Sequence, residues 1–304
     1  MLTSFFPAHC SIFDSHIPGL YEFVYPGDVV EKCPEQVLSD VLGLGVSIRR
    51  PFLALFALFG TVLGLLGALR LKSILTSIRS KRAHPEAPTL HNPEFYWMLA
   101  FLFFGMMNFN GLFLHCLLPF SETTGVSALE RPYFWMGDSF TTGAFGNALW
   151  AAAMMESLPT LGILPKKQCW DVVPLAWAVG NMVGLGAIAW FFILGYDADS
   201  KLPGTLPLEM WYGGPPAVFA SSALILLLFR KFNWVLCVAF PLSYITFLAA
   251  LCLDAFLCRS FENAFLDLLT QPTLMFLATD MVFLGIAVWL EIIHQKQGRK
   301  AKLA

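Results

Sequence analysis

The chain has 304 residues and a formal net charge of -2, and 57% of its residues are hydrophobic whereas only 13% are charged. Soluble domains carry about a quarter charged residues to cover their surfaces. The composition therefore excludes an ordinary soluble protein and gives no sign of nucleic-acid binding. It predicts an all-α polytopic membrane protein whose main solvent is the lipid bilayer.

Seven apolar segments are long enough to cross a membrane as helices, which takes roughly 20 residues each. The third segment is the weakest, because Asp138, Thr142 and other polar residues dilute it. Together the segments predict a seven-transmembrane-helix bundle, with spans at 51–72, 94–119, 133–157, 171–195, 212–230, 233–257 and 271–293.

The orientation follows from the distribution of Lys and Arg. Most of the 19 basic residues fall after the first, third and fifth spans and in the C-terminal tail, and such loops stay in the cytosol. The sequence thus predicts three parts: an exoplasmic N-terminal segment (1–48), a seven-helix transmembrane domain (49–295) and a cytosolic basic tail (296–304). Residues 1–20 lack the basic start and continuous apolar core of a cleaved signal peptide.

The N-terminal segment carries two local predictions. Residues 36–48 form either a short amphipathic helix on the membrane surface or an ordered lead-in to the first span. Cys10 and Cys33 lie in the same segment, where oxidation is possible, so a disulfide between them is our first choice. A bridge from one of them to Cys258 is the alternative, since sequence cannot fix connectivity.

The C-terminal tail ends with Lys300-Ala-Lys302-Leu-Ala. This pattern resembles the dilysine signal that returns membrane proteins to the endoplasmic reticulum, an address that is read at a cytosolic C-terminus. It predicts residence in the endoplasmic reticulum or early Golgi. The alternative is an ordinary basic tail that only obeys the charge rule.

Ionisable groups inside the spans indicate where a functional site would lie, because each costs roughly 2.5–3.5 kcal/mol at the bilayer centre. Four such groups stand out, and with the predicted topology all of them fall in the exoplasmic half of the membrane: His115, Asp138, Asp254 and Asp280. Asn108 and Thr142 accompany them at helical spacing, and they complete a candidate polar pocket of His115, Asp138, Asp254, Asp280, Asn108 and Thr142. The alternative is that two of the acids are solvated near the interface, while His115 and Asp280 make interhelical hydrogen bonds.

Small residues on two spans predict close helix packing. Gly60-x-x-x-Gly64 lies in the first span and Gly180-x-x-x-Gly184 in the fourth. This spacing lets the backbones of neighbouring helices approach each other.

Part of the pattern is similar to the seven-helix zinc amide hydrolases of the alkaline ceramidase and adiponectin-receptor superfamily. The similarity rests on Gly111-x-x-x-His115, the later Asp138 and a polar start to the last span. Glycine replaces the family's serine, and the last span offers Asp280 in place of a histidine pair. A zinc site needs three protein ligands, which His115, Asp138 and Asp280 would have to supply in a different arrangement. We therefore assign neither the family nor a metal.

Two functions of different classes remain. The first is a non-enzymatic accessory or partner-binding subunit in a membrane complex of the early secretory pathway. The alternative is a lipid-active enzyme or lipid-binding protein that uses the exoplasmic polar pocket. The partners are the lipid bilayer and, under the first hypothesis, other membrane subunits. The sequence leaves the cofactor unknown and leaves open whether the chain is an enzyme.

Overall fold

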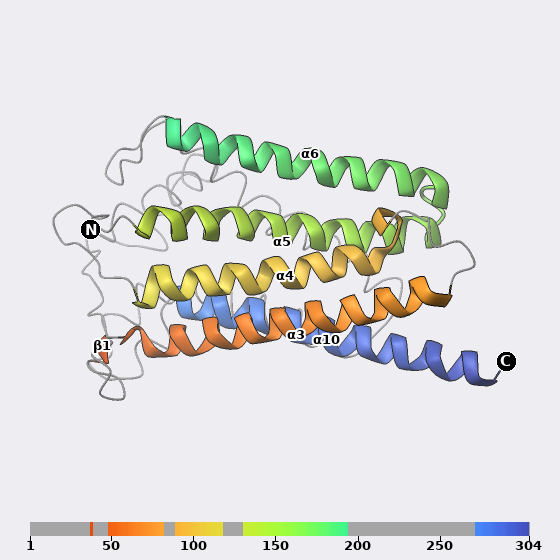
Figure 1. Cartoon of the computed structure of the whole chain (residues 1–304), viewed down its shortest axis with the longest axis horizontal. Helices are drawn as coiled ribbons and strands as arrows, with labels where there is room; N and C mark the ends of the chain where they lie inside the picture. The colour runs from red at the N-terminus through yellow and green to blue at the C-terminus, as the bar shows by residue number, and fades with distance from the viewer. Residues whose placement is uncertain (1–36, 39–47, 82–88, 118–129, 194–270, 304) are drawn as a thin grey trace, which may run out of the picture.

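The computed structural model describes residues 37–38, 48–81, 89–117, 130–193 and 271–303, and this part of the chain is almost entirely helical (Figure 1). Two short strands, β1 (Val37–Leu38) and β2 (Ile48–Arg49), pair in antiparallel fashion. The long helices are α3 (Pro51–Lys81), α4 (Pro93–Leu112), α5 (Glu130–Thr160), α6 (Lys166–Ile193) and α10 (Gln271–Leu303). A 3-10 turn, η3 (Thr89–His91), precedes α4, and a π-helical turn, η4 (Phe113–Leu117), follows it.

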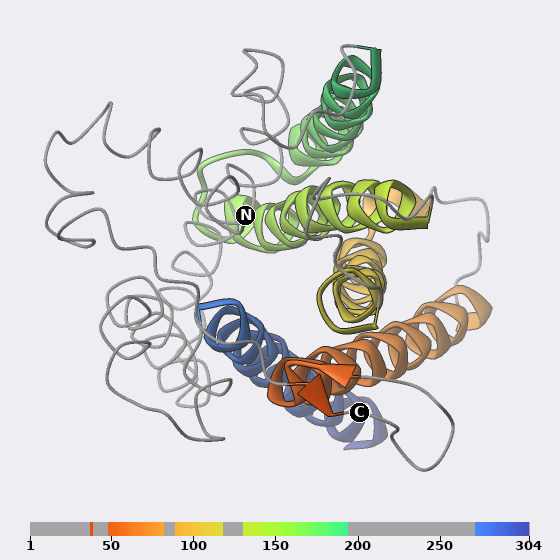
Figure 2. The same cartoon turned by 90° about the vertical axis from the view of Figure 1, so that its left-hand side faces the viewer.

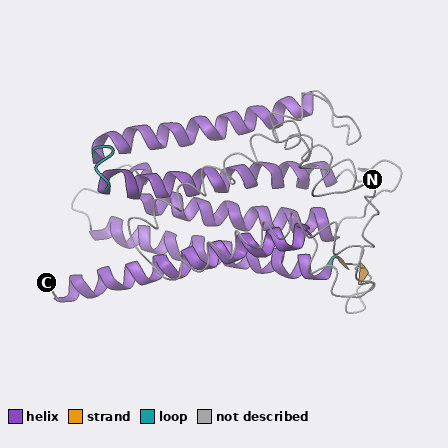
Figure 3. Ribbon diagram, turned by 180° about the vertical axis from the view of Figure 1, so that it is seen from behind, coloured by secondary structure: helices purple, strands orange, loops and turns teal. Residues whose placement is uncertain are grey.

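The long helices lie roughly side by side, and consecutive ones run in opposite directions (Figure 1). We call the two ends of the bundle the strand end, next to β1, and the tail end, where α10 finishes. The helices α3, α5 and α10 begin at the strand end, whereas α4 and α6 finish there. Viewed along the bundle, α4 lies between α3 and α5, α6 packs outside α5, and α10 lies beside α3 (Figure 2). Figure 3 shows the same arrangement from behind.

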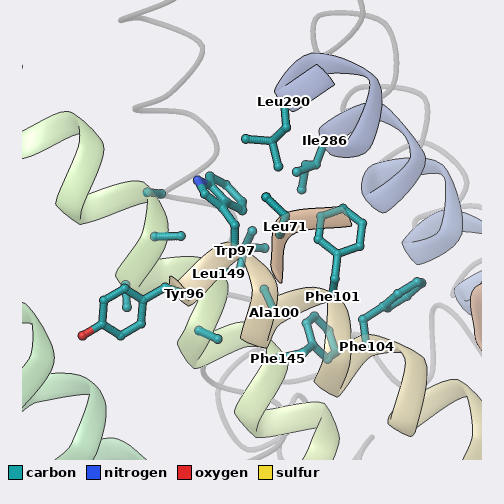
Figure 4. Close-up of a cluster of buried hydrophobic side chains, with 14 of the residues drawn as sticks. Leu71, Tyr96, Trp97, Ala100, Phe101, Phe104, Phe145, Leu149, Ile286 and Leu290 are labelled. Carbon is teal, nitrogen blue, oxygen red and sulfur yellow. The ribbon is translucent and has the colours of Figure 1, made fainter. Parts of the chain in front are cut away.

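Aromatic side chains of α4 form the core (Figure 4). Phe104 stacks on Phe283 of α10 with ring centroids 3.9 Å apart, and Trp97 meets Trp289 of the same helix edge to face. On the other side of α4, the alanines at 148, 151, 152 and 153 of α5 are fully buried. Large rings on one helix against small residues on its neighbour fill the space without voids.

The helices α3 and α4 approach each other at glycines. A Cβ on Gly64 would lie 2.5 Å from the Cα of Gly105 and 2.6 Å from the carbonyl oxygen of Phe101. On α6, Gly180 faces a side chain instead, that of Asn147 on α5. These contacts confirm the predicted packing role of Gly64 and Gly180 within the bundle.

Four of the described helices are long and apolar enough to cross a membrane: the spans are Pro51–Ser77, Pro93–Leu112, Lys166–Ala189 and Phe276–His294. The chain is thus consistent with an all-α integral membrane protein. The remaining long helix, α5, does not reach the same apolarity, and it is the segment that the sequence marked as weakest. Its middle, from Gly143 to Leu149, is buried among its neighbours.

The helix bounds agree closely with those predicted at 51–72, 94–119, 133–157, 171–195 and 271–293. The main differences are the tail-end extensions of α3 to Lys81 and of α10 to Leu303, and the end of α4 at Leu112, after which the π-helical turn η4 takes the place of the predicted α-helix. Of the two interpretations of 36–48, the amphipathic helix is wrong where the segment is described, because residues 37, 38 and 48 are extended and paired. The pairing favours the other interpretation, an ordered lead-in to the first span. The predicted spans 212–230 and 233–257 lie outside the described residues.

Candidate functional site

Three helices bring a carboxylate and an amide together inside the bundle. Asp280 of α10 is 2% exposed and Asn108 of α4 is 0% exposed. Asn108 Oδ1 and Asp280 Oδ1 both lie within 2.5 Å of the position that a Cβ on Gly60 of α3 would occupy. Because both oxygens lie within 2.5 Å of one point, they are separated by no more than about 5 Å. Gly60 leaves the space that the two polar groups fill, since any larger residue would collide with both.

The oxygens in this cluster lack hydrogen-bond donors. Asn108 donates from Nδ2 to the carbonyl oxygen of Phe104, one turn earlier on α4, at 2.9 Å. Among the described residues, Asn108 Oδ1 and both carboxylate oxygens of Asp280 are buried and accept no hydrogen bond. Buried polar atoms are rarely left in this state, because an unmade hydrogen bond costs about 1–3 kcal/mol. The cluster is thus a set of three buried acceptors, and a bound hydrogen-bond donor would stabilise it.

A second acid lies one turn closer to the strand end. Asp138 of α5 places Oδ1 3.7 Å from where a Cβ on Gly111 would lie, and Phe276 of α10 reaches the same position. Gly111 follows Asn108 by three residues and Phe276 precedes Asp280 by four, so both pairs lie on shared helix faces. Asp138 Oδ1 is also buried without a donor, although the residue as a whole is only partly buried. The polar residues therefore form a column with two levels.

This column lies in the half of the bundle next to the strand end. Asn108 is four residues from the end of its apolar span at Leu112, and Asp280 is four residues from the start of its span at Phe276. At 1.5 Å per residue, each lies about 6 Å along its helix from that bound. Asn108 and Asp280 therefore lie at the same level of two antiparallel helices, as their shared contact with the position beside Gly60 also shows.

Of the six predicted pocket residues, Asn108, Asp138 and Asp280 lie in this column. Thr142 is partly buried, whereas its neighbour Thr141 is buried and donates to the carbonyl oxygen of Gly137 at 2.6 Å. His115 is in η4, and its side chain is outside what the structure describes. Asp254 lies outside the described residues.

No group of three His, Cys, Asp or Glu side chains that could hold a metal ion occurs in the part of the chain that the structure describes.

The predicted disulfide between Cys10 and Cys33 lies outside the described residues, as does Cys258. Cys116 and Cys169 are described, and both are buried.

Sequence reasoning missed Gly60 as part of the site, although it named the glycine as a packing residue. It also missed Asn110, whose amide occupies the space beside Gly137. The sequence did contain a signal for these contacts, because Gly60 and Gly137 lie on spans next to the one that carries Asn108 and Asn110. Asn147 is one of the other polar residues that dilute the third predicted span. Its Nδ2 donates to the carbonyl oxygen of Trp177 at 3.0 Å and joins α5 to α6.

The tail end has polar contacts of a different kind, in which acidic side chains accept hydrogen bonds, although Ser157 Oγ and His294 Nε2 are buried there without a partner among the described residues. Trp97 Nε1 donates to Glu156 at 2.9 Å. Arg70 makes a two-pronged contact with Glu291, with N–O distances of 3.0 and 3.2 Å. The unmatched acceptors of the column therefore stand apart from the paired acids at the tail end.

No family model, curated protein or solved structure matches this chain.

Proposed function

We propose that this chain is a seven-helix membrane protein with its strand end on the exoplasmic side and its tail end in the cytosol. The alternating helices support this proposal. Because α6 finishes at the end where α10 begins, an even number of crossings must join them, as the predicted spans 212–230 and 233–257 provide. The end of α3, the start of α6 and the end of α10 bring Arg70, Lys166 and Lys300 to one end of the bundle, as the positive-inside rule requires.

Lys300 and Lys302 fall in the last turn of α10, at that same end. A dilysine signal is read only from the cytosol. The topology therefore supports our proposal that the protein resides in the endoplasmic reticulum or early Golgi.

Within that membrane, we propose that the protein binds a lipid whose polar headgroup donates hydrogen bonds to Asp138. The observation that carries this function is the unpartnered Oδ1 of Asp138, at the level of the column nearer the strand end. This atom is buried, but the residue as a whole is only partly buried, so a headgroup would reach the carboxylate from its exposed side. An acceptor at this depth is within reach of the headgroups of the exoplasmic leaflet. An acid here favours ammonium or hydroxyl donors over phosphate.

Native mass spectrometry of protein reconstituted with two phospholipids tests this function. Phosphatidylethanolamine has N–H donors, whereas phosphatidylcholine has none, so we expect the wild-type protein to retain the former selectively. Asp138→Asn should lose that selectivity. Asp171→Asn is the matched control, because Asp171 is an exposed aspartate of α6 near the tail end. Equal retention of both lipids by the wild type, or unchanged selectivity in Asp138→Asn, would overturn the lipid-binding function.

The second candidate function is the accessory or partner-binding subunit. The observation that favours it is the outer face of α6, where Leu175, Val179, Met182 and Val183 are exposed among the described residues. In a membrane, this face would contact lipid or the helix of another subunit. The same mass spectra, taken directly from solubilised native membranes, would show a stoichiometric protein partner under this hypothesis. Release of this chain from the membrane without any protein partner would contradict the hypothesis.

A further inference from the structure

The level of the column that holds Asp280 and Asn108 differs from the level that holds Asp138, because Asp280 and Asn108 are almost completely buried. A headgroup has no room beside them, since their side chains fill the space that the missing Cβ of Gly60 leaves. Whatever satisfies their three oxygens must be very small. The candidates are a proton, a water molecule and a metal cation. A water molecule would donate hydrogen bonds but would leave the charge of the buried carboxylate uncompensated, so it does not replace the proton.

The number of ligands decides between the proton and the metal cation. Hard divalent cations take six or more oxygen ligands, whereas the described cluster offers three, and two of those belong to one carboxylate. A proton needs only one donor atom and one acceptor. It also removes the charge of an isolated carboxylate, which would cost several kcal/mol to bury in an apolar interior, and a buried acid in that situation becomes neutral instead.

We propose that Asp280 and Asn108 form an intramembrane proton-binding site, in which Asp280 is a neutral carboxylic acid that donates its O–H to Asn108 Oδ1. One proton taken from water then satisfies Asn108 Oδ1 and one carboxyl oxygen together. The other carboxyl oxygen remains a neutral carbonyl, which is far less costly to bury than a carboxylate. The Nδ2 of Asn108 is held by the Phe104 carbonyl, so this hydrogen bond turns the amide oxygen toward α10. The proposal does not depend on lipid binding at Asp138.

Two substitutions at position 280 separate the neutral acid from a carboxylate. Asp280→Asn keeps the shape and supplies an N–H donor in place of the O–H. We therefore expect its apparent melting temperature in detergent to stay within about 2 °C of the wild type. Asp280→Leu removes the donor and leaves Asn108 Oδ1 unpaired, so its melting temperature should fall by roughly 3–6 °C. A carboxylate that binds a cation predicts the opposite for Asp280→Asn, which would then lose stability together with its ligand.

Infrared spectroscopy at neutral pH gives a readout that a merely structural role would not change. The wild type should show the carbonyl band of a protonated carboxylic acid, and this band should disappear in Asp280→Asn. Asn108→Leu should shift the band to higher frequency, because the acid loses its acceptor. Asp171→Asn is the control and should leave the band unchanged. Absence of the band from the wild type would overturn the proposal, as would stabilisation by added sodium or calcium that Asp280→Asn abolishes.

Discussion

Gly64→Ala tests whether α3 and α4 are in direct backbone contact. The new Cβ would lie 2.5 Å from the Cα and N of Gly105 and 2.6 Å from the carbonyl oxygen of Phe101. All three atoms belong to the helix backbone, so no side chain can rotate away. Restoring an ordinary contact of 3.4 Å requires the two helices to separate by roughly 1 Å.

The expected cost follows from two opposing effects. Overpacking of a well-filled interface costs about 1–3 kcal/mol. Alanine recovers up to about 1 kcal/mol, because it is a better helix former than glycine. We therefore expect the free energy of unfolding to fall by about 1 kcal/mol in Gly64→Ala.

Gly186→Ala is the matched control. Gly186 lies on α6, and nothing is within 4 Å of the position of its Cβ. This variant should gain only the better helix propensity of alanine, about 1 kcal/mol, so the free energies of unfolding of the two variants should differ by about 2 kcal/mol. The measurement is reversible unfolding in mixed micelles with a denaturing detergent, followed by circular dichroism. If both variants unfold at the same detergent fraction, the close contact of α3 and α4 is wrong.

Two further predictions concern the tail end. Trp97→Phe should lower the free energy of unfolding by about 1–3 kcal/mol, because it removes the hydrogen bond to Glu156. Trp177→Phe is the control, because the indole N–H of Trp177 is already unpartnered among the described residues, and it should cost less in the same micelle titration. The reverse order would refute the hydrogen bond between Trp97 and Glu156. The exposed pair of Arg70 and Glu291, at 58% and 39% side-chain exposure, should contribute at most about 1 kcal/mol in a double-mutant cycle. A coupling well above that, or one insensitive to salt, would contradict the exposed setting.

The bounds of the described helices were predictable, because the apolar stretch needed to cross hydrocarbon has a nearly fixed length. The tail-end extensions of α3 and α10 were not, since charged residues there obey no length rule. Asn108, Asp138 and Asp280 were predictable as polar residues in the strand-end half. Their partners were not, because the period of a helix gives its faces but not the neighbour that each face meets. Gly60 enters the site only through the packing of α3 against both α4 and α10.

The predicted helical spacing of Asn108 and His115 shows a different limit. That prediction assumed α-helical spacing throughout, but α4 ends at Leu112 and a π-helical turn begins at Phe113. A π turn closes its hydrogen bonds one residue later than an α turn, so the spacing rule does not hold beyond that point. Such turns frequently accompany functional sites. The candidate site therefore lies next to a local irregularity that the sequence pattern could not reveal.

The composition of α5 follows from its position. A helix that faces lipid needs large apolar side chains, as α6 carries on its exposed face. A helix enclosed by protein needs small residues and matched polar groups, because close packing replaces contact with lipid. In α5 the buried alanines accept the rings of α4, while Asn147 bonds to α6 and Asp138 faces Gly111. Its weak apolar signal is therefore what an inner membrane helix should have, and it supports our proposal that α5 crosses the bilayer together with its four described neighbours.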